Sequence, residues 1–254
     1  SKCRPKPLKV LGPFEWRLRN PSALPKKPGQ RWFLWRREPG EIEIKPMSSL
    51  SHDDLVVIAQ RTLDHYRGRA EDFWLGTRDH DVSQNIQTLL SHIEGDAPYR
   101  ILDLGCGPGR DLMAFKQLGH EPVGLDGAEP FCRMAREFSG CSVLCQDFLA
   151  LDLPAGHFDG IFANASLFHV PAQELPRVLR ELKDALKEGG VFFSSNPRGE
   201  NREGWNGERY GSYHDLQTWR AFMSAAGFQE LEHYYRPPGL PRNQQPWLAS
   251  AWRG

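Results

Sequence analysis

The stretch ILDLGCGPGR, residues 101–110, decides how the rest of the sequence is interpreted. An apolar run passes through Asp103 into three glycines at alternate positions, Gly105, Gly107 and Gly109, just before a helical pattern. Glycine lets the backbone approach a bound molecule closely, and ligands of open parallel sheets bind beyond the carboxyl ends of the strands. The stretch therefore predicts a ligand-binding turn between a strand and a helix.

The residues around these glycines restrict the chemistry of the ligand. A phosphate-binding loop ends in Lys followed by Ser or Thr, and no such pair follows Gly109. The dinucleotide fingerprint is spaced G-x-G-x-x-G, whereas the spacing here is G-x-G-x-G. The carboxylate of Asp103 would repel a phosphate and attract an ammonium group. The stretch thus favours a cofactor with a positively charged amine and without a phosphate.

On both sides of this turn, short apolar runs alternate with helical patterns. Such alternation indicates crossover units and an α/β fold, a mostly parallel sheet with helices on both faces. The last two strands have no helix between them, so one of them must run antiparallel. The expected strands are residues 99–105, 121–126, 142–148, 158–166, 191–197, 228–237 and 246–253, and the expected helices are 51–66, one ending near Gly95, 109–119, 128–140, 172–190 and 216–228.

Charge is distributed unevenly along the 254 residues, although the chain as a whole has no net charge. Residues 1–50 carry 12 Lys and Arg against 4 Glu, and residues 51–254 carry the opposite excess. The basic stretch is also rich in proline, which prevents a long helix, and in aromatic residues. We expect a basic, proline-rich extension at 1–50 before one domain at 51–254. The extension is either an arm that contacts the core or an acidic partner, or a solvated linker.

The five cysteines are odd in number and lack the spacing of a metal site. Small buried hydrophobic positions explain them best, including the pair Cys141 and Cys145. We therefore expect no metal and a reducing, cytoplasmic compartment. No apolar run approaches the roughly 18 residues of a transmembrane helix, and no signal peptide is recognisable, so no membrane association is expected.

From about Leu63 to the C-terminus the sequence resembles the class I S-adenosylmethionine-dependent methyltransferases, most closely short enzymes with a UbiE-like methyltransferase domain. ILDLGCGPG is similar to the first motif of this family, and VGLDG, CQDF and FANASLFHV follow in order at successive strand ends. The resemblance implies a Rossmann-like sheet of seven strands with the last strand antiparallel. It also implies S-adenosylmethionine as cofactor and S-adenosylhomocysteine as product. The cofactor-binding residues that it implies are Asp103, Gly105, Gly107, Gly109, Asp126, Asp147, Phe148 and Asn164.

The resemblance gives these residues separate roles. Asp126, at the end of a strand, would accept hydrogen bonds from the ribose hydroxyls. Asp147 would bind the adenine amino group, with Phe148 against the ring, and Asn164 would lie beside the methionine part. Each also has an ordinary interpretation as a capping or turn residue, and Arg110 is expected to be a solvated residue of a first helical turn. The helical cover of the cofactor, by the same resemblance, would include Tyr66, Phe73, Trp74 and Arg78.

The segment NPRGENREGWNGERYGSYHD, residues 196–215, is expected to be a long loop that covers the acceptor. Its aromatic rings could enclose a small ligand and an arginine could bind a carboxylate in bidentate fashion; the alternative is a solvated surface loop. Neutral histidine near pH 7 can accept a proton, so His169 and His214 are the candidate catalytic bases. The candidate acceptor-binding residues are Phe168, Arg198, Trp205, Arg209, Tyr210 and Tyr213.

These observations predict a methyltransferase that acts on a small molecule at a nitrogen, oxygen or sulfur atom. Transfer would be an in-line displacement, in which alignment supplies much of the catalysis. RNA or protein methylation with the basic arm holding the substrate is an alternative. It ranks lower because no separate RNA-binding motif is present and residues 51–254 are acidic. A non-catalytic module that binds the cofactor is a second alternative.

Overall fold

The computed structural model describes residues 49–254, so the expectations for the basic extension lie outside the described residues, apart from its last two positions. Leu50 is tied to the domain because its N–H donates to Oε1 of Gln173 over 2.7 Å. Among the described residues, no helix is both long enough and apolar enough to cross a membrane.

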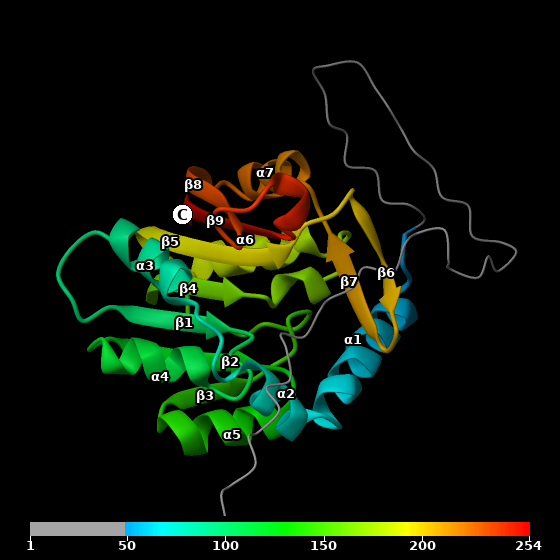
Figure 1. Ribbon diagram of the computed structural model, residues 1–254, viewed down its shortest axis with the longest axis horizontal. Coiled ribbons are helices and arrows are strands. Elements are labelled where there is room, and N and C mark those ends of the chain that lie inside the picture. The colour runs from blue at the N-terminus through cyan, green and yellow to red at the C-terminus, as the bar shows by residue number, and fades with distance from the viewer. Residues whose placement is uncertain (1–48) are drawn as a thin grey trace, which may run out of the picture. The chain divides into compact units, whose positions relative to one another are not determined.

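A seven-stranded sheet forms the centre of the domain (Figure 1). The strand order is β3-β2-β1-β4-β5-β9-β8. β1 to β5 are mutually parallel, and β9 runs antiparallel to both of its neighbours, β5 and β8. The predicted α/β fold with an antiparallel last strand is therefore confirmed. The strands are β1 (Arg100–Leu104), β2 (Glu121–Asp126), β3 (Ser142–Cys145), β4 (Phe158–Asn164), β5 (Leu186–Pro197), β8 (Gln229–Arg236) and β9 (Trp247–Arg253).

Helices cover both faces of this sheet. Apolar residues of α3 and α4 pack on one face in a cluster that includes Leu89, Phe115 and Phe162, and α5 continues this layer over β2 and β3. On the other face, α6 and α7 pack around Leu179 and Phe222. The helices are α1 (His52–Arg67), α2 (Ala70–Thr77), α3 (Ser83–His92), α4 (Arg110–Gln117), α5 (Glu129–Ser139), α6 (Leu175–Ala185) and α7 (Leu216–Ala225), with short 3-10 turns η2 (Leu167–His169) and η3 (Arg242–Gln244).

Two helix boundaries differ from the sequence expectations. The helix expected to end near Gly95 is divided into α2 and α3, with residues 78–82 between them. The helix expected over 172–190 ends at Ala185, because the chain already pairs with β4 at Leu186. An irregularity in the β4–β5 register takes up the extra residues before Val191. The glycines at 189 and 190 thus belong to a distorted strand rather than to a helix end.

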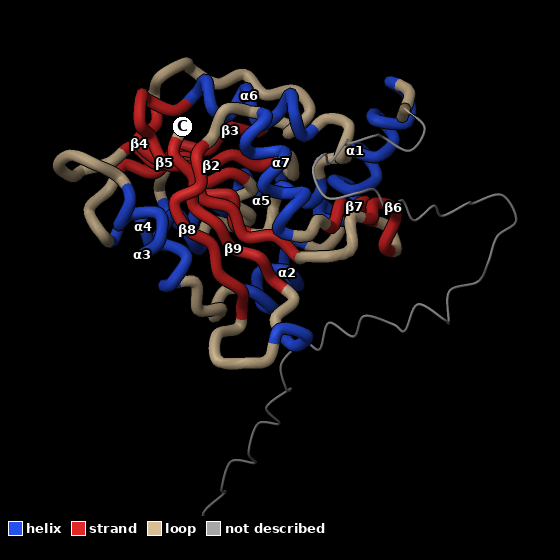
Figure 2. Tube along the Cα trace, turned by 90° about the horizontal axis from the view of Figure 1, so that it is seen from above, coloured by secondary structure: helices blue, strands red, loops and turns tan. Residues whose placement is uncertain are grey.

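The segment expected to be a loop is largely a β-hairpin, so that expectation was wrong in form. β6 (Arg202–Asn206) and β7 (Arg209–Tyr213) pair antiparallel across a two-residue turn. The two central residues of this turn are Gly207 and Glu208. Glycine at the first central position is a hairpin signal, and Gly207 takes a φ of 63° there. The hairpin lies beside α1 and apart from the main sheet in both views (Figures 1 and 2).

Candidate active site

The turn between β1 and α4 forms the base of the site. Gly105, Gly107 and Gly109 have φ values of 77°, 51° and 94°, which residues with a side chain rarely adopt. A Cβ at Gly105 would lie 2.3 Å from Cβ of Ser166, and one at Gly109 would lie 2.9 Å from Cα of Ala135. The turn therefore requires glycine both for its backbone conformation and for the close approach of α5 and of the segment after β4.

Asp103 is fully buried at the end of β1, and its Oδ2 has no hydrogen-bond partner among the described residues. Burial, together with the nearby carboxylates of Asp111 and Asp126, raises the pKa of Asp103 well above its usual range, although Arg110 opposes this. A buried carboxylate without a partner is costly. An ammonium group of a ligand would supply both the missing hydrogen bond and the missing charge.

Asp126 ends β2 with its carboxylate held in place by backbone donors. Oδ1 accepts from the N–H of Ala128 over 2.8 Å, and Oδ2 accepts from the N–H of Gly107 over 3.0 Å. Burial raises the pKa of Asp126 to about 6, against the effect of these hydrogen bonds. A third backbone donor, Gly127, also acts on this carboxylate. A carboxylate has about four lone-pair sites, so Asp126 can still accept from a neighbouring hydroxyl.

The end of β3 contributes Asp147 and Phe148 to the same crevice. Oδ1 of Asp147 accepts from the N–H of Leu149 over 2.9 Å, which fixes the carboxylate in a local turn. The ring of Phe148 lies directly against the glycine turn, since its Cζ would be 3.2 Å from a Cβ at Gly105. The strand ends of β1, β2 and β3 thus converge as parallel strand ends are expected to do.

Asn164, at the end of β4, belongs to a side-chain network. Its Nδ2 donates to Oδ2 of Asp111 over 3.3 Å, and its Oδ1 accepts from Asn85 of α3 over 3.0 Å. The next residue, Ala165, has a φ of 62°, and such strained backbone is frequent at functional sites. The network holds Asn164 between α3 and α4.

Arg110 is a correction to the sequence interpretation, because it is not a solvated residue. Its guanidinium forms two hydrogen bonds with Asp111, of 2.6 and 2.8 Å. It also donates to the carbonyl oxygen of Thr77 over 2.8 Å. Arg110 therefore connects the first turn of α4 to the last residue of α2.

Aromatic residues of the N-terminal helices cover the glycine turn. The rings of Tyr66 and Phe73 both contact Phe131 of α5, with centroid distances of 5.8 and 5.0 Å. Cε1 of Phe73 would be 3.4 Å from a Cβ at Gly107. The structure thus places Tyr66 and Phe73 where the resemblance expected a cover over the cofactor.

The other two expected cover residues lie elsewhere. Trp74 packs on Phe138 of α5 with a centroid distance of 4.8 Å. Arg78 pairs with Asp79 at the surface. Nothing in these contacts directs either side chain to the glycine turn.

His169 lies between Tyr66 and the hairpin. Its Nδ1 is 2.7 Å from the carbonyl oxygen of Tyr210, and its Nε2 is 2.7 Å from Oη of Tyr66. Burial lowers the pKa of His169 to about 4, so the ring is neutral at pH 7. Both ring nitrogens are thus engaged within the protein. A substrate would reach the imidazole only through Tyr66.

The hairpin and η2 bring aromatic residues around this histidine. The ring of Phe168 lies tilted against His169 with centroids 3.9 Å apart, and the ring of Tyr213 lies 6.1 Å from that of Phe168. Tyr210 is buried, and its N–H donates to Oγ1 of Thr62 in α1. Of the expected acceptor residues, Phe168, Tyr210 and Tyr213 are therefore brought together.

Arg209 joins this group from β7. Its Nη1 donates to Oη of Tyr66 over 3.3 Å. Trp205, in contrast, is 41% exposed and stacks under Arg61 of α1 at 4.5 Å. Together with Tyr210 and residues at the start of α1, Trp205 lines a separate surface hollow of about 220 Å³.

Arg198 and His214 have contacts away from this group. The guanidinium of Arg198 donates to the carbonyl oxygens of Gln245 and Arg242, and so fastens the end of β5 to the β8–β9 connection. The ring of His214 packs on Phe222 of α7, with centroids 5.1 Å apart. Neither ring nitrogen of His214 has a partner among the described residues, and burial lowers its pKa to about 4.

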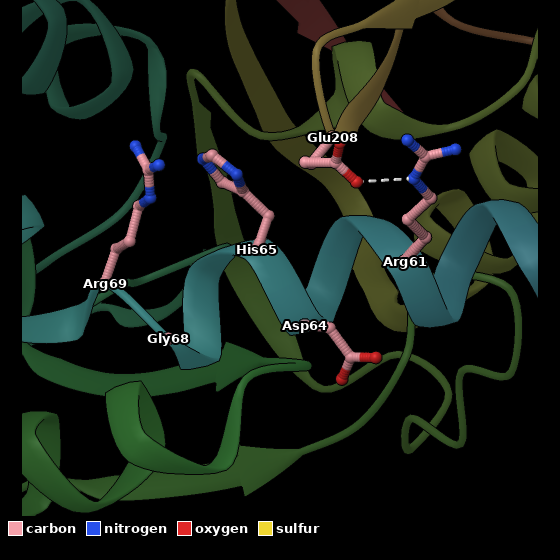
Figure 3. Close-up of a pocket in the computed structure, with 6 residues that line it drawn as sticks. All are labelled: Arg61, Asp64, His65, Gly68, Arg69 and Glu208. Carbon is pink, nitrogen blue, oxygen red and sulfur yellow. Dashed lines mark hydrogen bonds and ion pairs between the residues drawn. The ribbon is translucent and has the colours of Figure 1, made fainter.

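A larger hollow of about 420 Å³ opens between α1 and the hairpin turn (Figure 3). Arg61 points toward Glu208 of the hairpin turn, and His65 and Arg69 project to the same side of the chain, whereas Asp64 points to the other side. Arg61 pairs with Glu208 of the turn over 2.7 Å. His65 adjoins Tyr66, with ring centroids 5.4 Å apart. The hollow therefore combines two arginines with two acidic residues, Asp64 and Glu208, and lies next to the Tyr66–His169 pair.

Comparison with known proteins agrees with this geometry. Residues 101–190 match the family model described as a methyltransferase domain. The chain carries a class I S-adenosylmethionine-dependent methyltransferase domain. The matched segment of this methyltransferase domain runs from β1 through the glycine turn and the ends of β2, β3 and β4 to the irregular start of β5.

Two curated relatives of this methyltransferase domain act on very different acceptors. The 18S rRNA (guanine-N(7))-methyltransferase bud23 of Schizosaccharomyces pombe is 28% identical over 124 residues, which cover 42% of this chain and 46% of bud23. The trans-aconitate 2-methyltransferase of Azoarcus sp. (strain BH72) is 34% identical over 114 residues, which cover 43% of this chain and 44% of that protein. The chain thus spans less than half the length of each of these relatives.

The fold of the methyltransferase domain extends further than the sequence matches. The crystal structure of Burkholderia thailandensis 1,6-didemethyltoxoflavin-N1-methyltransferase, with its substrate and S-adenosylhomocysteine bound, superposes with a TM-score of 0.65 at 19% identity. The similarity covers 83% of this chain and 92% of that one. It extends the shared fold beyond the segment that the family model matches.

Sequence reasoning did not single out four polar residues of the methyltransferase domain. Asn85 and Asp111 orient Asn164, and Ser166 closes on Gly105 with a buried hydroxyl that has no partner among the described residues. Thr62 holds the backbone of β7. Only Asp111 had a recognisable signal, as an acid in a first helical turn; the others lie in ordinary helix or loop sequence.

Proposed function

We propose that this protein transfers the methyl group of S-adenosylmethionine to a small anionic acceptor. The observation that carries the proposal is the buried carboxylate of Asp103, whose Oδ2 lacks a partner among residues 49–254, beside a turn whose backbone strongly favours glycine. A cationic ligand is the chemical complement of such a group. The UbiE-like subtype and a cytoplasmic location remain our expectations.

The residues at the strand ends fit the cofactor. Asp103 would pair with its ammonium group, and the carboxylate of Asp126 would accept from the ribose hydroxyls. Asp147 and Phe148 would contact the adenine, and Asn164, held by its network, would lie beside the methionine part. When bound, the cofactor supplies a methyl group on a positively charged sulfur. The protein residues then bind and orient the reactants and exclude water.

The acceptor would lie between η2, the hairpin and α1. Phe168 and Tyr213 supply aromatic surface there, and Arg209 contributes a guanidinium beside Tyr66. Arg69, from the hollow between α1 and the hairpin turn, adds a second guanidinium near this region, whereas Arg61 is paired with Glu208. We therefore assign the anionic anchor to Arg209 rather than to Arg198, whose guanidinium binds carbonyl oxygens of the β8–β9 connection.

A panel of small acceptors tests this proposal. The full chain would be incubated with methyl-labelled S-adenosylmethionine and 4-hydroxybenzoate, 4-mercaptobenzoate, 4-aminobenzoate, benzoate or the uncharged phenol. We expect methylation of at least one anionic member, and Arg209→Ala should raise KM for it while the Kd for S-adenosylhomocysteine stays within twofold. Arg198→Ala is the matched control and should leave KM unchanged. Labelling of RNA but of no small acceptor would overturn the proposal and favour the basic stretch 1–50 as a substrate arm.

A further inference from the structure

A chain of hydrogen bonds with a fixed direction runs from β7 to Tyr66. The carbonyl oxygen of Tyr210 can only accept, so Nδ1 of His169, 2.7 Å away, must carry the ring proton. In the neutral imidazole, Nε2 then has only a lone pair. Oη of Tyr66, 2.7 Å from Nε2, must donate its proton to it. The hydroxyl proton of Tyr66 is therefore committed to His169, and its oxygen presents lone pairs to everything else.

The contacts of Tyr66 connect this oxygen to the hairpin and to the glycine turn. Arg209 donates to it from the hairpin side. The ring carrying it packs edge-on against Phe73 and tilted against Phe131, and Phe73 touches the glycine turn. Tyr66 thus lies where the cover of the cofactor cleft meets the acceptor region. A lone pair of this oxygen can accept a hydrogen bond from the molecule to be methylated. The hydroxyl cannot donate a hydrogen bond to that molecule without breaking its bond to His169.

We propose that Tyr66 is the catalytic residue that takes the proton of the acceptor, with His169 as the positioning residue that receives the phenolic proton in turn. This inference rests on the proposed function. As the nucleophile X of an acceptor X–H attacks, the bond between X and the methyl carbon forms and the carbon–sulfur bond breaks. The electron pair of that bond stays on sulfur. The proton of X moves to Oη of Tyr66, the phenolic proton moves to Nε2 of His169, and it leaves to solvent after product release.

The direction of this series of hydrogen bonds also limits which chemical groups can be methylated. A hydroxyl, thiol or uncharged amine can donate to Oη of Tyr66, whereas a carboxylate oxygen cannot and would face a lone pair instead. The acceptor should therefore combine an anionic group near Arg209 with a separate nucleophile that carries a hydrogen. Methyl ester formation on a carboxylate is the wrong chemistry for this site.

The first test compares Tyr66→Phe with Tyr99→Phe in the full chain. Tyr99 also donates through its hydroxyl, to the carbonyl of Gly95 over 2.9 Å, but lies before β1 and outside the site. With 4-hydroxybenzoate we expect Tyr66→Phe to lower kcat about 100-fold, within the range of general base catalysis, with KM and the Kd for S-adenosylhomocysteine within threefold. Tyr99→Phe should keep wild-type kcat. His169→Gln should reproduce most of the loss.

A more acidic phenol separates proton transfer from a merely structural role. 3-Nitro-4-hydroxybenzoate is ionised at pH 8, so its methylation needs no base. With this phenol, the loss of kcat in Tyr66→Phe relative to the wild type should shrink to less than fivefold. An equal deficit for both phenols would overturn the proton-acceptor role. Methylation of benzoate but of no hydroxyl, thiol or amine would overturn this inference while leaving the proposed function intact. If no small acceptor is methylated, both fail together.

Nitrogen-15 NMR of the histidines gives a second readout that does not depend on any acceptor. The resonances of His169, assigned by their loss in His169→Gln, should show a neutral ring protonated at Nδ1 at pH 7. Tyr66→Phe should shift the Nε2 resonance toward that of a nitrogen without a hydrogen bond. A ring protonated at Nε2, or a cationic ring at pH 7, would overturn the assigned direction.

Discussion

The backbone N–H of Gly107 donates a hydrogen bond of 3.0 Å to Oδ2 of Asp126. This bond joins the glycine turn after β1 to the carboxylate at the end of β2. One peptide group thereby sets both the shape of the turn and the direction of the carboxylate. Gly107 adopts a positive φ of 51° in this turn. The ends of β1 and β2 are consequently coupled, and a change at either should affect both.

Asp126→Ala should weaken the binding of S-adenosylhomocysteine. The variant loses the charge-assisted hydrogen bonds to the ribose, which corresponds to about 1.5–3 kcal/mol of binding free energy. Isothermal titration calorimetry would measure it. The control is Asp152→Ala, at an exposed position bonded only through its backbone. An unchanged Kd in Asp126→Ala would contradict the ribose role.

Binding of S-adenosylhomocysteine should depend on pH through Asp126. Its pKa of about 6 in the free protein means that the carboxylate is ionised at pH 7.5 and mostly protonated at pH 5. Hydroxyl groups donate more strongly to the ionised carboxylate. The Kd should therefore rise up to about tenfold as the pH falls from 7.5 to 5, because pH 5 is about one unit below the pKa. Calorimetry across this range checks the profile. In Asp126→Asn the profile should be flatter, and equal slopes in both proteins would assign the titration to another group.

Asp103→Asn should stabilise the free protein and weaken cofactor binding. Burial raises the pKa of Asp103 in the folded state, so ionisation costs folding free energy, and this cost grows as pH rises from the unfolded pKa toward the folded one. The variant lacks this cost. Its Tm should exceed that of the wild type at pH 8, and the difference should narrow toward pH 4. A lower Tm at pH 8 with weakened binding would show that the carboxylate has a partner in the free protein.

Gly105→Ala should be more damaging than Gly156→Ala. Both glycines have positive φ, 77° and 58°, so both variants incur backbone strain of about 1–2 kcal/mol. Only at Gly105 would the new Cβ collide with Ser166, whereas nothing lies within 4 Å at Gly156. Denaturant unfolding should therefore show a clearly larger loss for Gly105→Ala. Equal losses of unfolding free energy in the two variants would mean that the segment after β4 can shift away from the new Cβ without loss of stability.

The sequence predicted the sheet well because the information was local. Apolar runs of strand length and glycine stops defined most elements, and the missing helix before β9 defined its direction. The hairpin was missed because the glycines and charges of 196–215 were weighed as loop features, although the turn glycine, Gly207, was present. The start of β5 was missed because pairing of Leu186 with Phe158 is a contact between distant positions.

The strand-end acids of the candidate site could be predicted from the sequence, whereas the contacts between its distant side chains could not. Asp103 and Asp126 lie at the ends of β1 and β2, and Asp147 follows β3, so their position at one edge follows from topology. The occupation of both nitrogens of His169 does not, because it needs Tyr66 from α1 and the Tyr210 carbonyl from β7. For the same reason, Arg198 and Arg209 are alike in sequence but differ in contacts: one binds the β8–β9 connection and the other reaches Tyr66.

The bond from Arg110 to the carbonyl oxygen of Thr77 has a kinetic consequence. Thr77 ends the helix that carries Phe73, and Phe73 rests on the glycine turn. We expect a ligand as large as the cofactor to enter or leave only when α2 moves away from the turn, and this movement would break the hydrogen bond between Arg110 and Thr77. Opening is therefore an activated step, separate from methyl transfer. This hydrogen bond would favour slow dissociation of S-adenosylhomocysteine, and product release would then limit the rate of turnover.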